Sequence, residues 1–196
     1  MKNLFAENLF NVSGILSADE CRNLIDRGEE IGFQQAAVRT ASGPKLIPGI
    51  RDNDRAEFSD PTLASVLWER CRHFVPPELD GGIAVGIDDN FRFYRYDPGQ
   101  RFKRHKDGLV KQSPEVWSRL SCLFYLNDGF SGGETVFYSS EMVDGVRNEE
   151  YTITPQTGEA LFFPHEMWHE GRTLITGRKY VLRSDLFYFF PMTENP

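Results

Sequence analysis

Cysteine, positive net charge and long apolar runs are the features that this sequence has least of. Its three cysteines, Cys21, Cys71 and Cys122, lie far apart and form no CxxC pair. This usage argues against a disulfide scaffold and predicts a reducing, cytoplasmic location. The formal net charge is −7. We therefore expect no nucleic-acid partner, because such binding depends on basic surfaces.

Segments that target or anchor a chain are also missing. The opening stretch MKNLFAENLFNVSGIL is interrupted by Glu7 and does not look like a signal peptide. No later run is long enough to cross a bilayer, so we expect no membrane partner. There is no repeat, low-complexity tract or linker. We expect a single domain over residues 1–196, and the sequence carries no signal for an oligomeric state.

Two helices are predicted before residue 85. Ser17 and Glu20 form a capping box at the start of residues 17–31. Asp60 and Pro61 are typical of the first turn of a second helix over residues 60–75. Turn-forming residues dominate residues 34–58, so we expect a loop there.

From about residue 88 the chain reads as a series of short strands rich in aromatic residues. The predicted strand segments are NFRFYRY, SRLSCLFYLND, ETVFYSS, the two halves of EEYTITPQTGEALFFP, and RKYVLRSDLFYFF. This order predicts an α+β, mainly β fold in which helices support an antiparallel sandwich, with a jelly roll as one example. The helical support would span about 1–85 and the jelly-roll core about 88–190.

The stretch RFKRHKD, residues 101–107, contains a candidate metal site. Residues i and i+2 of a strand share a face, so His105 and Asp107 could reach one cation. A pair of this kind is more often a polar surface pair, so a third ligand is needed. His73 lies in the second predicted helix, which leaves His165 and His169. Two histidines and one carboxylate form the facial triad of non-haem iron oxygenases.

A cation for an anionic cosubstrate lies further along the chain. Lys179 follows His169 by ten residues and shares a predicted strand face with Val181 and Arg183. A buried lysine or arginine needs a carboxylate partner, which could come from the protein or from a ligand.

These motifs together resemble the iron(II)- and 2-oxoglutarate-dependent dioxygenases, and more narrowly the prolyl 4-hydroxylase-like branch. The resemblance covers roughly residues 88–190 and rests on HxD, GGET, TGxALxF, HEG and GRKY in consistent order. A weaker similarity lies in VRTASGP, residues 38–44. The resemblance implies a jelly-roll (double-stranded β-helix) fold.

The resemblance also implies roles for particular residues. His105, Asp107 and His169 match the iron ligands, and HEG together with the distance to Lys179 favours His169 over His165. Lys179 matches the base that binds the distal carboxylate of 2-oxoglutarate.

Three further positions match the family or depart from it. Tyr96 matches a tyrosine of the cosubstrate pocket, and Gly132 and Gly133 match a tight turn. Phe124 stands where some relatives have a second tyrosine. Arg183 stands where relatives with a single base often have threonine, so it could share the carboxylate contact or take it over from Lys179.

The implied activity is hydroxylation of an unactivated C–H bond, with release of succinate and CO2. The resemblance implies Fe(II), 2-oxoglutarate and O2, and leaves ascorbate open as a further cofactor. The expected substrate is a peptidyl, prolyl-like side chain or a free amino-acid-like small molecule. Two alternatives stay open: a non-catalytic module that binds 2-oxoglutarate or metal, and a nucleic-acid demethylating oxygenase.

Substrate specificity is expected in loops, with residues 34–58, 108–117 and 138–150 as candidates. Lys103, Arg104 and Lys106 suggest an acidic or carboxylate-bearing substrate, although a run of this kind is usually a solvated face. Phe91, Phe93, Phe102, Leu123, Phe162 and Phe163 are candidate apolar walls of the pocket, or plain core.

Overall fold

Two antiparallel β-sheets form the body of the protein in the computed structural model, which describes residues 1–36, 38–40, 43–45, 49–142 and 145–191. The larger sheet contains β1 (Lys2–Ala6), β2 (Leu9–Val12), β3 (Gln34–Gln35), β6 (Asp54–Ser59), β7 (Glu78–Leu79), β8 (Gly82–Ile87), β9 (Asn90–Tyr96), β11 (Val116–Tyr125), β15 (Ala160–Pro164) and β18 (Lys179–Phe189). The smaller sheet contains β10 (Phe102–His105), β13 (Thr135–Tyr138), β14 (Glu149–Ile153) and β16 (Trp168–Gly171). Two short pairs are β4 (Val38–Thr40) with β5 (Gly43–Lys45), and β12 (Ser131–Gly132) with β17 (Leu174–Thr176).

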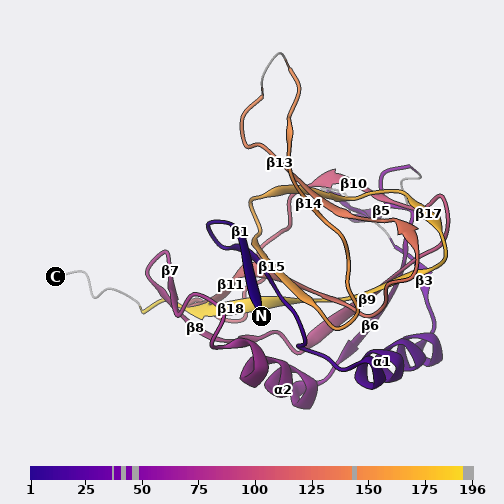
Figure 1. The fold of residues 1–196 in the computed structure, drawn as a ribbon. Coiled ribbons are helices and arrows are strands. Elements are labelled where there is room, and N and C mark those ends of the chain that lie inside the picture. Colours follow the sequence, from indigo (N-terminus) through magenta and orange to yellow (C-terminus); the bar gives the residue numbers. More distant parts are fainter. Residues whose placement is uncertain (37, 41–42, 46–48, 143–144, 192–196) are drawn as a thin grey trace.

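The order of strands places the C-terminal strand at the centre of the larger sheet. That order is β1-β2-β15-β11-β18-β9-β6-β3, with β8 and then β7 attached beside β18, and the smaller sheet runs β10-β16-β13-β14. Figure 1 shows the smaller sheet on one side of the larger sheet and both helices on the other. The predicted α+β, mainly β jelly roll with supporting helices is confirmed.

Both helices begin where the sequence predicts. In α1 (Ala18–Ile31), the Ser17 hydroxyl accepts from the Glu20 amide and the Glu20 side chain accepts from the Ser17 amide. In α2 (Pro61–Cys71), the Asp60 side chain accepts from the Leu63 amide. This helix ends at Cys71, so His73 lies in the turn beyond it. No described helix is long and apolar enough to cross a membrane.

Strand β18 is buried on both faces, and one of these faces lines the space between the two sheets. All its residues except the last are buried, because the helices cover one face and the smaller sheet the other. One core cluster, which includes Phe93 and Leu182, lies between the larger sheet and the helices. A second cluster, which includes Tyr96 and Val181, lies between the two sheets. Successive residues of β18 therefore face a helical core and an inter-sheet space in turn.

The N-terminal part contains more strand than the sequence predicts. Residues 34–58 were expected to be a loop, yet this segment contains β3, β4, β5 and most of β6. The β1–β2 hairpin also joins the larger sheet, so residues 1–85 are not only helical. Within β6 only Ala56 is buried, and a polar strand near a sheet edge hides the alternating pattern that reveals a strand. Residues 37, 41–42 and 46–48 lie outside the described residues, so part of the VRTASGP stretch cannot be placed.

Candidate metal and cosubstrate site

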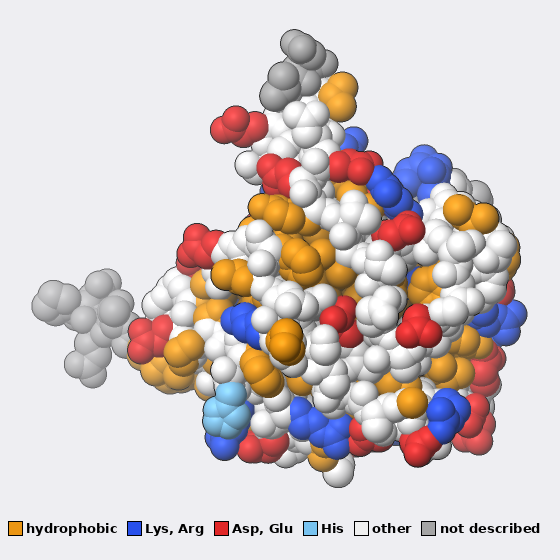
Figure 2. Space-filling model, in the orientation of Figure 1, with side chains coloured by type: hydrophobic (Ala, Val, Ile, Leu, Met, Phe, Trp, Pro, Cys, Tyr) orange, Lys and Arg blue, Asp and Glu red, His pale blue; other side chains and the backbone are white. Residues whose placement is uncertain are grey.

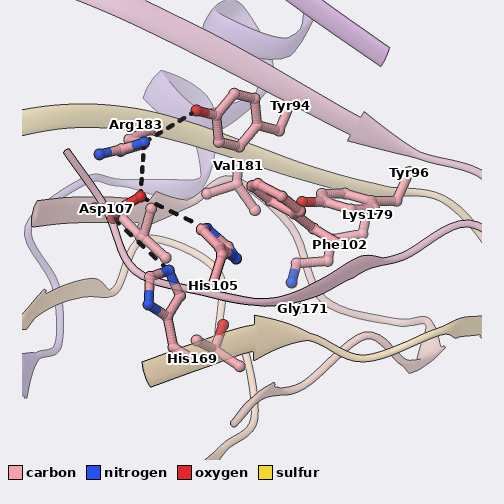
Figure 3. A pocket seen from close by; sticks show the side chains of 12 residues that line it. Tyr94, Tyr96, Phe102, His105, Asp107, His169, Gly171, Lys179, Val181 and Arg183 are labelled. Atoms are coloured by element: carbon pink, nitrogen blue, oxygen red, sulfur yellow. Dashed lines mark hydrogen bonds and ion pairs between the residues drawn. The ribbon is translucent and has the colours of Figure 1, made fainter. Parts of the chain in front are cut away.

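A pocket between the two sheets brings together the six metal and cosubstrate residues that the sequence predicts. Its lining comes from β9, β10, β11, β13, β16 and β18, and Figure 3 shows most of these side chains pointing into one space. The lining residues are Tyr94, Tyr96, Phe102, His105, Asp107, Leu123, Thr135, His169, Gly171, Lys179, Val181 and Arg183.

Three potential metal ligands converge at one end of this pocket. His105 and His169 are directly opposite each other on the neighbouring strands β10 and β16. Asp107 lies just beyond β10, and its amide donates to the His165 carbonyl at 3.0 Å. Ligand atoms of His105, Asp107 and His169 all lie within 4.8 Å of one another. This is the two-histidine, one-carboxylate set that suits non-haem Fe(II).

Both histidine rings are oriented as metal ligands need to be. Nδ1 of His105 lies 2.8 Å from the Lys103 carbonyl, and Nδ1 of His169 lies 3.0 Å from the Met167 carbonyl. A carbonyl only accepts, so each Nδ1 donates and each Nε2 keeps a free lone pair. The two Nε2 atoms are 3.6 and 3.7 Å from the Asp107 carboxylate. These separations are too long for hydrogen bonds, and a shared cation between the three groups would explain them.

The protonation states also fit a metal site. Burial, together with neighbouring His105, lowers the pKa of His169 to about 3, so its ring is neutral near pH 7. Burial alone would raise the pKa of Asp107, but Arg183, His169 and His105 outweigh it and hold that pKa well below its usual value. The site thus offers neutral imidazole and ionised carboxylate, the forms in which these residues bind metal.

Asp107 is held in place by partners on both of its oxygens. Arg183 Nη1 lies 3.1 Å from Oδ1, and the Ser121 hydroxyl donates to Oδ2 at 2.6 Å. Behind them, His165 is bonded through its ring nitrogens to Ser118 and Ser121, at 2.8 and 2.9 Å. His165 therefore supports Asp107 from behind, and the geometry places His169 in the triad.

Lys179 lies at the other end of the pocket and has no anionic partner among the described residues. Its side chain is buried and donates to the Gly133 carbonyl at 2.6 Å, beside the rings of Tyr96 and Tyr125. Burial lowers the pKa of Lys179 to about 7, and Glu134 opposes this only in part. A buried cation without a counter-charge is costly, so this end of the pocket favours an anionic ligand.

Arg183 is two steps from Lys179 along the same strand face, but its charge is already neutralised. Lys179 is directly opposite Tyr96 on β9, whereas Arg183 is opposite Arg92. Arg183 contacts Asp107 at 3.1 Å and Asp185 at 3.2 Å. Figure 3 shows Arg183 and Lys179 at different ends of the pocket. The sequence left open whether Lys179 and Arg183 share the distal carboxylate of 2-oxoglutarate. This arrangement favours Lys179 alone.

Tyr94 and Tyr125 are lining or flanking residues that the sequence analysis missed. Tyr94 lies 3.4 Å from Arg183 through its hydroxyl, and Arg183, Arg51 and Arg92 overcome the effect of burial and lower its pKa to about 8. Tyr125 bonds to Thr135 at 2.7 Å, whereas Phe124 packs in the helical core. Strand alternation gives the signal, since Leu123 lines the pocket and Tyr125 is two residues later.

Only some of the expected apolar walls line the pocket. Phe102 stacks on His105 with ring centroids 3.6 Å apart, and Leu123 lies in the lining. Phe163 packs against the edge of His169 at 4.6 Å. The remaining three candidates belong to the core on the helical side of the larger sheet: Phe91, Phe93 and Phe162.

The two glycines predicted to form a tight turn both adopt a left-handed backbone conformation. Gly132 and Gly133 both have positive φ, at 74° and 72°. A Cβ on Gly132 would collide with the Thr173 carbonyl oxygen. The Gly133 carbonyl accepts the Lys179 bond, so this turn also positions the cation.

One family model matches part of the sequence. The model of the 2OG-Fe(II) oxygenase superfamily matches residues 91–184, a range that contains the triad, Tyr96, Lys179 and Arg183. No curated protein matches the sequence.

Three solved structures are similar to the whole chain. The viral collagen prolyl hydroxylase of Paramecium bursaria Chlorella virus-1, solved with 2-oxoglutarate, has a TM-score of 0.60 at 19% identity, covering 92% of this chain and 95% of that one. A Pseudomonas putida prolyl-4-hydroxylase has a TM-score of 0.63 at 21% identity, covering 94% and 93%. A Trichoplax adhaerens prolyl hydroxylase, solved with a hypoxia-inducible-factor peptide, has a TM-score of 0.65 at 19% identity, covering 93% and 83%. At these identities the likeness shows a shared fold.

Proposed function

We propose that the chain is a member of the 2OG-Fe(II) oxygenase superfamily, whose model matches residues 91–184, and that it hydroxylates an unactivated C–H bond in a prolyl-like side chain of a peptide. It is a 2-oxoglutarate-dependent dioxygenase that uses Fe(II), 2-oxoglutarate and O2. The observation that carries the proposal is the pocket itself, which joins a converging two-histidine, one-carboxylate set to a buried lysine without an anionic partner.

In this mechanism His105, Asp107 and His169 would hold the iron through two Nε2 atoms and a carboxylate. Bound Fe(II) supplies the oxidising chemistry, coupled to decarboxylation of 2-oxoglutarate to succinate and CO2. The protein's own residues bind, orient and exclude water. Phe102 stacks on His105 and fixes the plane of its ring, while Arg183 and Ser121 fix the Asp107 carboxylate.

The opposite end of the pocket suits the cosubstrate. Lys179 would take the distal carboxylate of 2-oxoglutarate, and the Tyr96 ring forms a wall beside it. Burial strengthens this charge pair, because water no longer screens it. Val181 separates Lys179 from Arg183, so the cosubstrate anchor and the ligand support stay distinct.

The choice of a peptide over a free amino acid rests on the names of similar structures. These are a collagen prolyl hydroxylase, a prolyl-4-hydroxylase and a prolyl hydroxylase solved with a peptide. Neither a nucleic-acid substrate nor a non-catalytic role finds support among these comparisons. The three free cysteines support a cytoplasmic location, which we retain as part of the proposal.

Anaerobic addition of Fe(II) and 2-oxoglutarate to the apoprotein tests the site. We expect a visible charge-transfer band for the wild type, and we expect His105→Ala and Asp107→Ala to abolish it. His165→Ala is the matched control, because that ring lies outside the triad and the band should survive its removal. Absence of the charge-transfer band in the wild type would refute the proposal.

The substrate class needs a second assay. Proline-containing peptides and free proline are incubated aerobically with the loaded enzyme, and mass spectrometry follows the gain of one oxygen atom. Hydroxylation of peptides alone supports a peptide substrate. Hydroxylation of free proline alone would move the assignment to a small molecule.

A further inference from the structure

Lysine and arginine side chains without an ion pair gather around one side of this protein. Among the described residues, most cations distant from the pocket have a carboxylate partner. Among the side chains that the structure describes away from the site, the exception is Lys2, which donates to the Phe74 carbonyl. Six cations without an ion pair belong to β10, its flanking segments or the β13–β14 hairpin: Arg101, Lys103, Arg104, Lys106, Lys111 and Arg147. A seventh, Arg51, is bridged to Phe102 of β10.

Three of these cations are held on two neighbouring aromatic rings. Lys106 Nζ lies 5.3 Å and Arg147 Cζ lies 4.9 Å from the centre of the Trp168 ring. Arg104 Cζ lies 4.8 Å from the centre of the Tyr138 ring. Tyr138 and Trp168 are directly opposite each other on β13 and β16. We call these five residues the Trp168 surface.

The Trp168 surface lies at the end of the smaller sheet where the triad is built. Strand β10 ends at His105 and β13 ends at Tyr138, whereas β14 begins just after Arg147 and β16 begins at Trp168. In an antiparallel sheet these four points share one end. Lys106 also lies between two triad residues, and Trp168 immediately precedes the third. Figure 1 shows the β13–β14 hairpin projecting beyond this end.

Acidic residues of the same region do not neutralise these cations. Glu149 pairs with Arg172, Glu166 lies 3.9 Å from Arg119, and Glu170 is close enough to Tyr138 to raise the pKa of its hydroxyl. Figure 2 shows acidic and basic side chains side by side at the base of the projecting hairpin. Among the described residues, the cations of the Trp168 surface therefore have no carboxylate partner, and Arg147 donates only to the carbonyls of Ser139 and Ser140. Their charges remain available to an external anion, although the chain carries a net charge of −7.

We propose that the Trp168 surface binds an acidic segment of the peptide substrate, next to the side chain that enters the pocket. This inference rests on the proposed peptide hydroxylase function and names its substrate class. Charge complementarity gives such a surface specificity and speeds association. Arg104, Lys106 and Arg147 would each meet an aspartate or glutamate side chain.

A nucleic acid fits this surface less well than an acidic peptide. Binding of single strands uses aromatic faces as platforms for stacked bases. Here cations already cover faces of Trp168 and Tyr138. The net charge of −7 would also repel a long polyanion, whereas a short acidic segment contacts only this local cluster.

The test measures peptide binding apart from turnover. A short fluorescein-labelled peptide with a central proline flanked by Asp and Glu is titrated anaerobically with the Fe(II)- and 2-oxoglutarate-loaded enzyme, and anisotropy is recorded. A second peptide has Asn and Gln in place of Asp and Glu. We expect the acidic peptide to bind more tightly, and added salt to remove the difference.

Variants locate the effect on the Trp168 surface. Each of Arg104→Gln, Lys106→Gln and Arg147→Gln should weaken binding of the acidic peptide by about threefold, as expected for exposed ion pairs. The neutral peptide should be unaffected. Arg22→Gln, a matched loss of charge on α1, should change neither affinity. Thermal melting of each variant separates lost binding from lost folding.

Three results would overturn the inference. The wild type could bind both peptides equally, the acidic preference could persist in the triple variant, or a single-stranded oligonucleotide of equal charge could bind more tightly. If the proposed function fails instead, the wild type lacks the charge-transfer band, which is read without any peptide. The two failures are therefore distinguishable.

Discussion

The charge state of Lys179 should make 2-oxoglutarate binding depend steeply on pH. In the empty pocket its pKa is lowered to about 7 by burial. A carboxylate bound beside it would raise that pKa again, because an opposite charge favours the protonated form. Binding then takes up a proton whenever the empty site is deprotonated. The affinity should therefore fall as the pH rises above 7.

The size of this effect follows from the fraction of protonated Lys179. That fraction is about one half at pH 7 and about one tenth at pH 8. Only the protonated site binds the cosubstrate dianion well, so the dissociation constant should rise about fivefold from pH 7 to pH 8 and about tenfold for each further pH unit. Below pH 6 it should be nearly constant. The folding stability of the empty protein should change in the opposite direction and increase as the pH rises from 7 towards 10.5. In this range the lysine is protonated in the unfolded chain but not in the folded protein.

Anaerobic titration with 2-oxoglutarate, followed by the charge-transfer band, measures the affinity at each pH. Lys179→Arg is the matched variant, because a guanidinium stays charged when buried and the pH dependence should disappear. Lys179→Met should bind weakly at every pH.

Tyr94 is the group that could imitate this behaviour, because its pKa is about 8. Tyr94→Phe removes that titration and should leave the slope unchanged. A flat affinity in the wild type between pH 6.5 and 8.5 would refute the reasoning. An equal slope in Lys179→Arg would also refute it, since the titrating group would then lie elsewhere.

Two further predictions concern the structure around the site. Arg183→Met leaves the buried carboxylates of Asp107 and Asp185 without their shared cation, so the metal-free protein should lose about 3 kcal/mol of stability. Mn(II) should raise the melting temperature of this variant more than that of the wild type; an equal rise would contradict the role given to Arg183. Gly158→Ala introduces a Cβ at φ 79° against the Leu16 carbonyl oxygen, and should lower the free energy of unfolding by more than about 2 kcal/mol. Denaturant unfolding measures this loss, and a change below about 0.5 kcal/mol would show that the turn relaxes freely.

Much of the site could be predicted because its chemistry follows local sequence patterns. Alternation along a strand places Lys179, Val181 and Arg183 on one face, and the structure puts all three in the pocket lining. The capping box at Ser17 was equally local, and it fixed the start of α1. Patterns of this kind need only the dihedral preferences of neighbouring residues.

Long-range pairing explains what the sequence could not reveal. Alternation shows which face Arg183 and Asp185 of β18 share, but the other partner, Asp107, depends on how the end of β10 meets β18 in space. The same limit applies to Tyr125, which faces Lys179 only because of the register between β11 and β18. The β1–β2 hairpin joins β15 across almost the whole chain, and no local pattern predicts such a pairing.

The two pocket cations differ in a way that matches their separate tasks. Arg183 has two permanent carboxylate partners, and an arginine that stays charged suits a permanent pair. Lys179 has no carboxylate partner among the described residues, and its pKa of about 7 lets it lose its proton when the pocket is empty. A buried ammonium without a counter-charge would be costly each time a dicarboxylate leaves. We infer that lysine at position 179 lowers this cost, whereas arginine at the same position would keep an unpaired charge in the empty pocket.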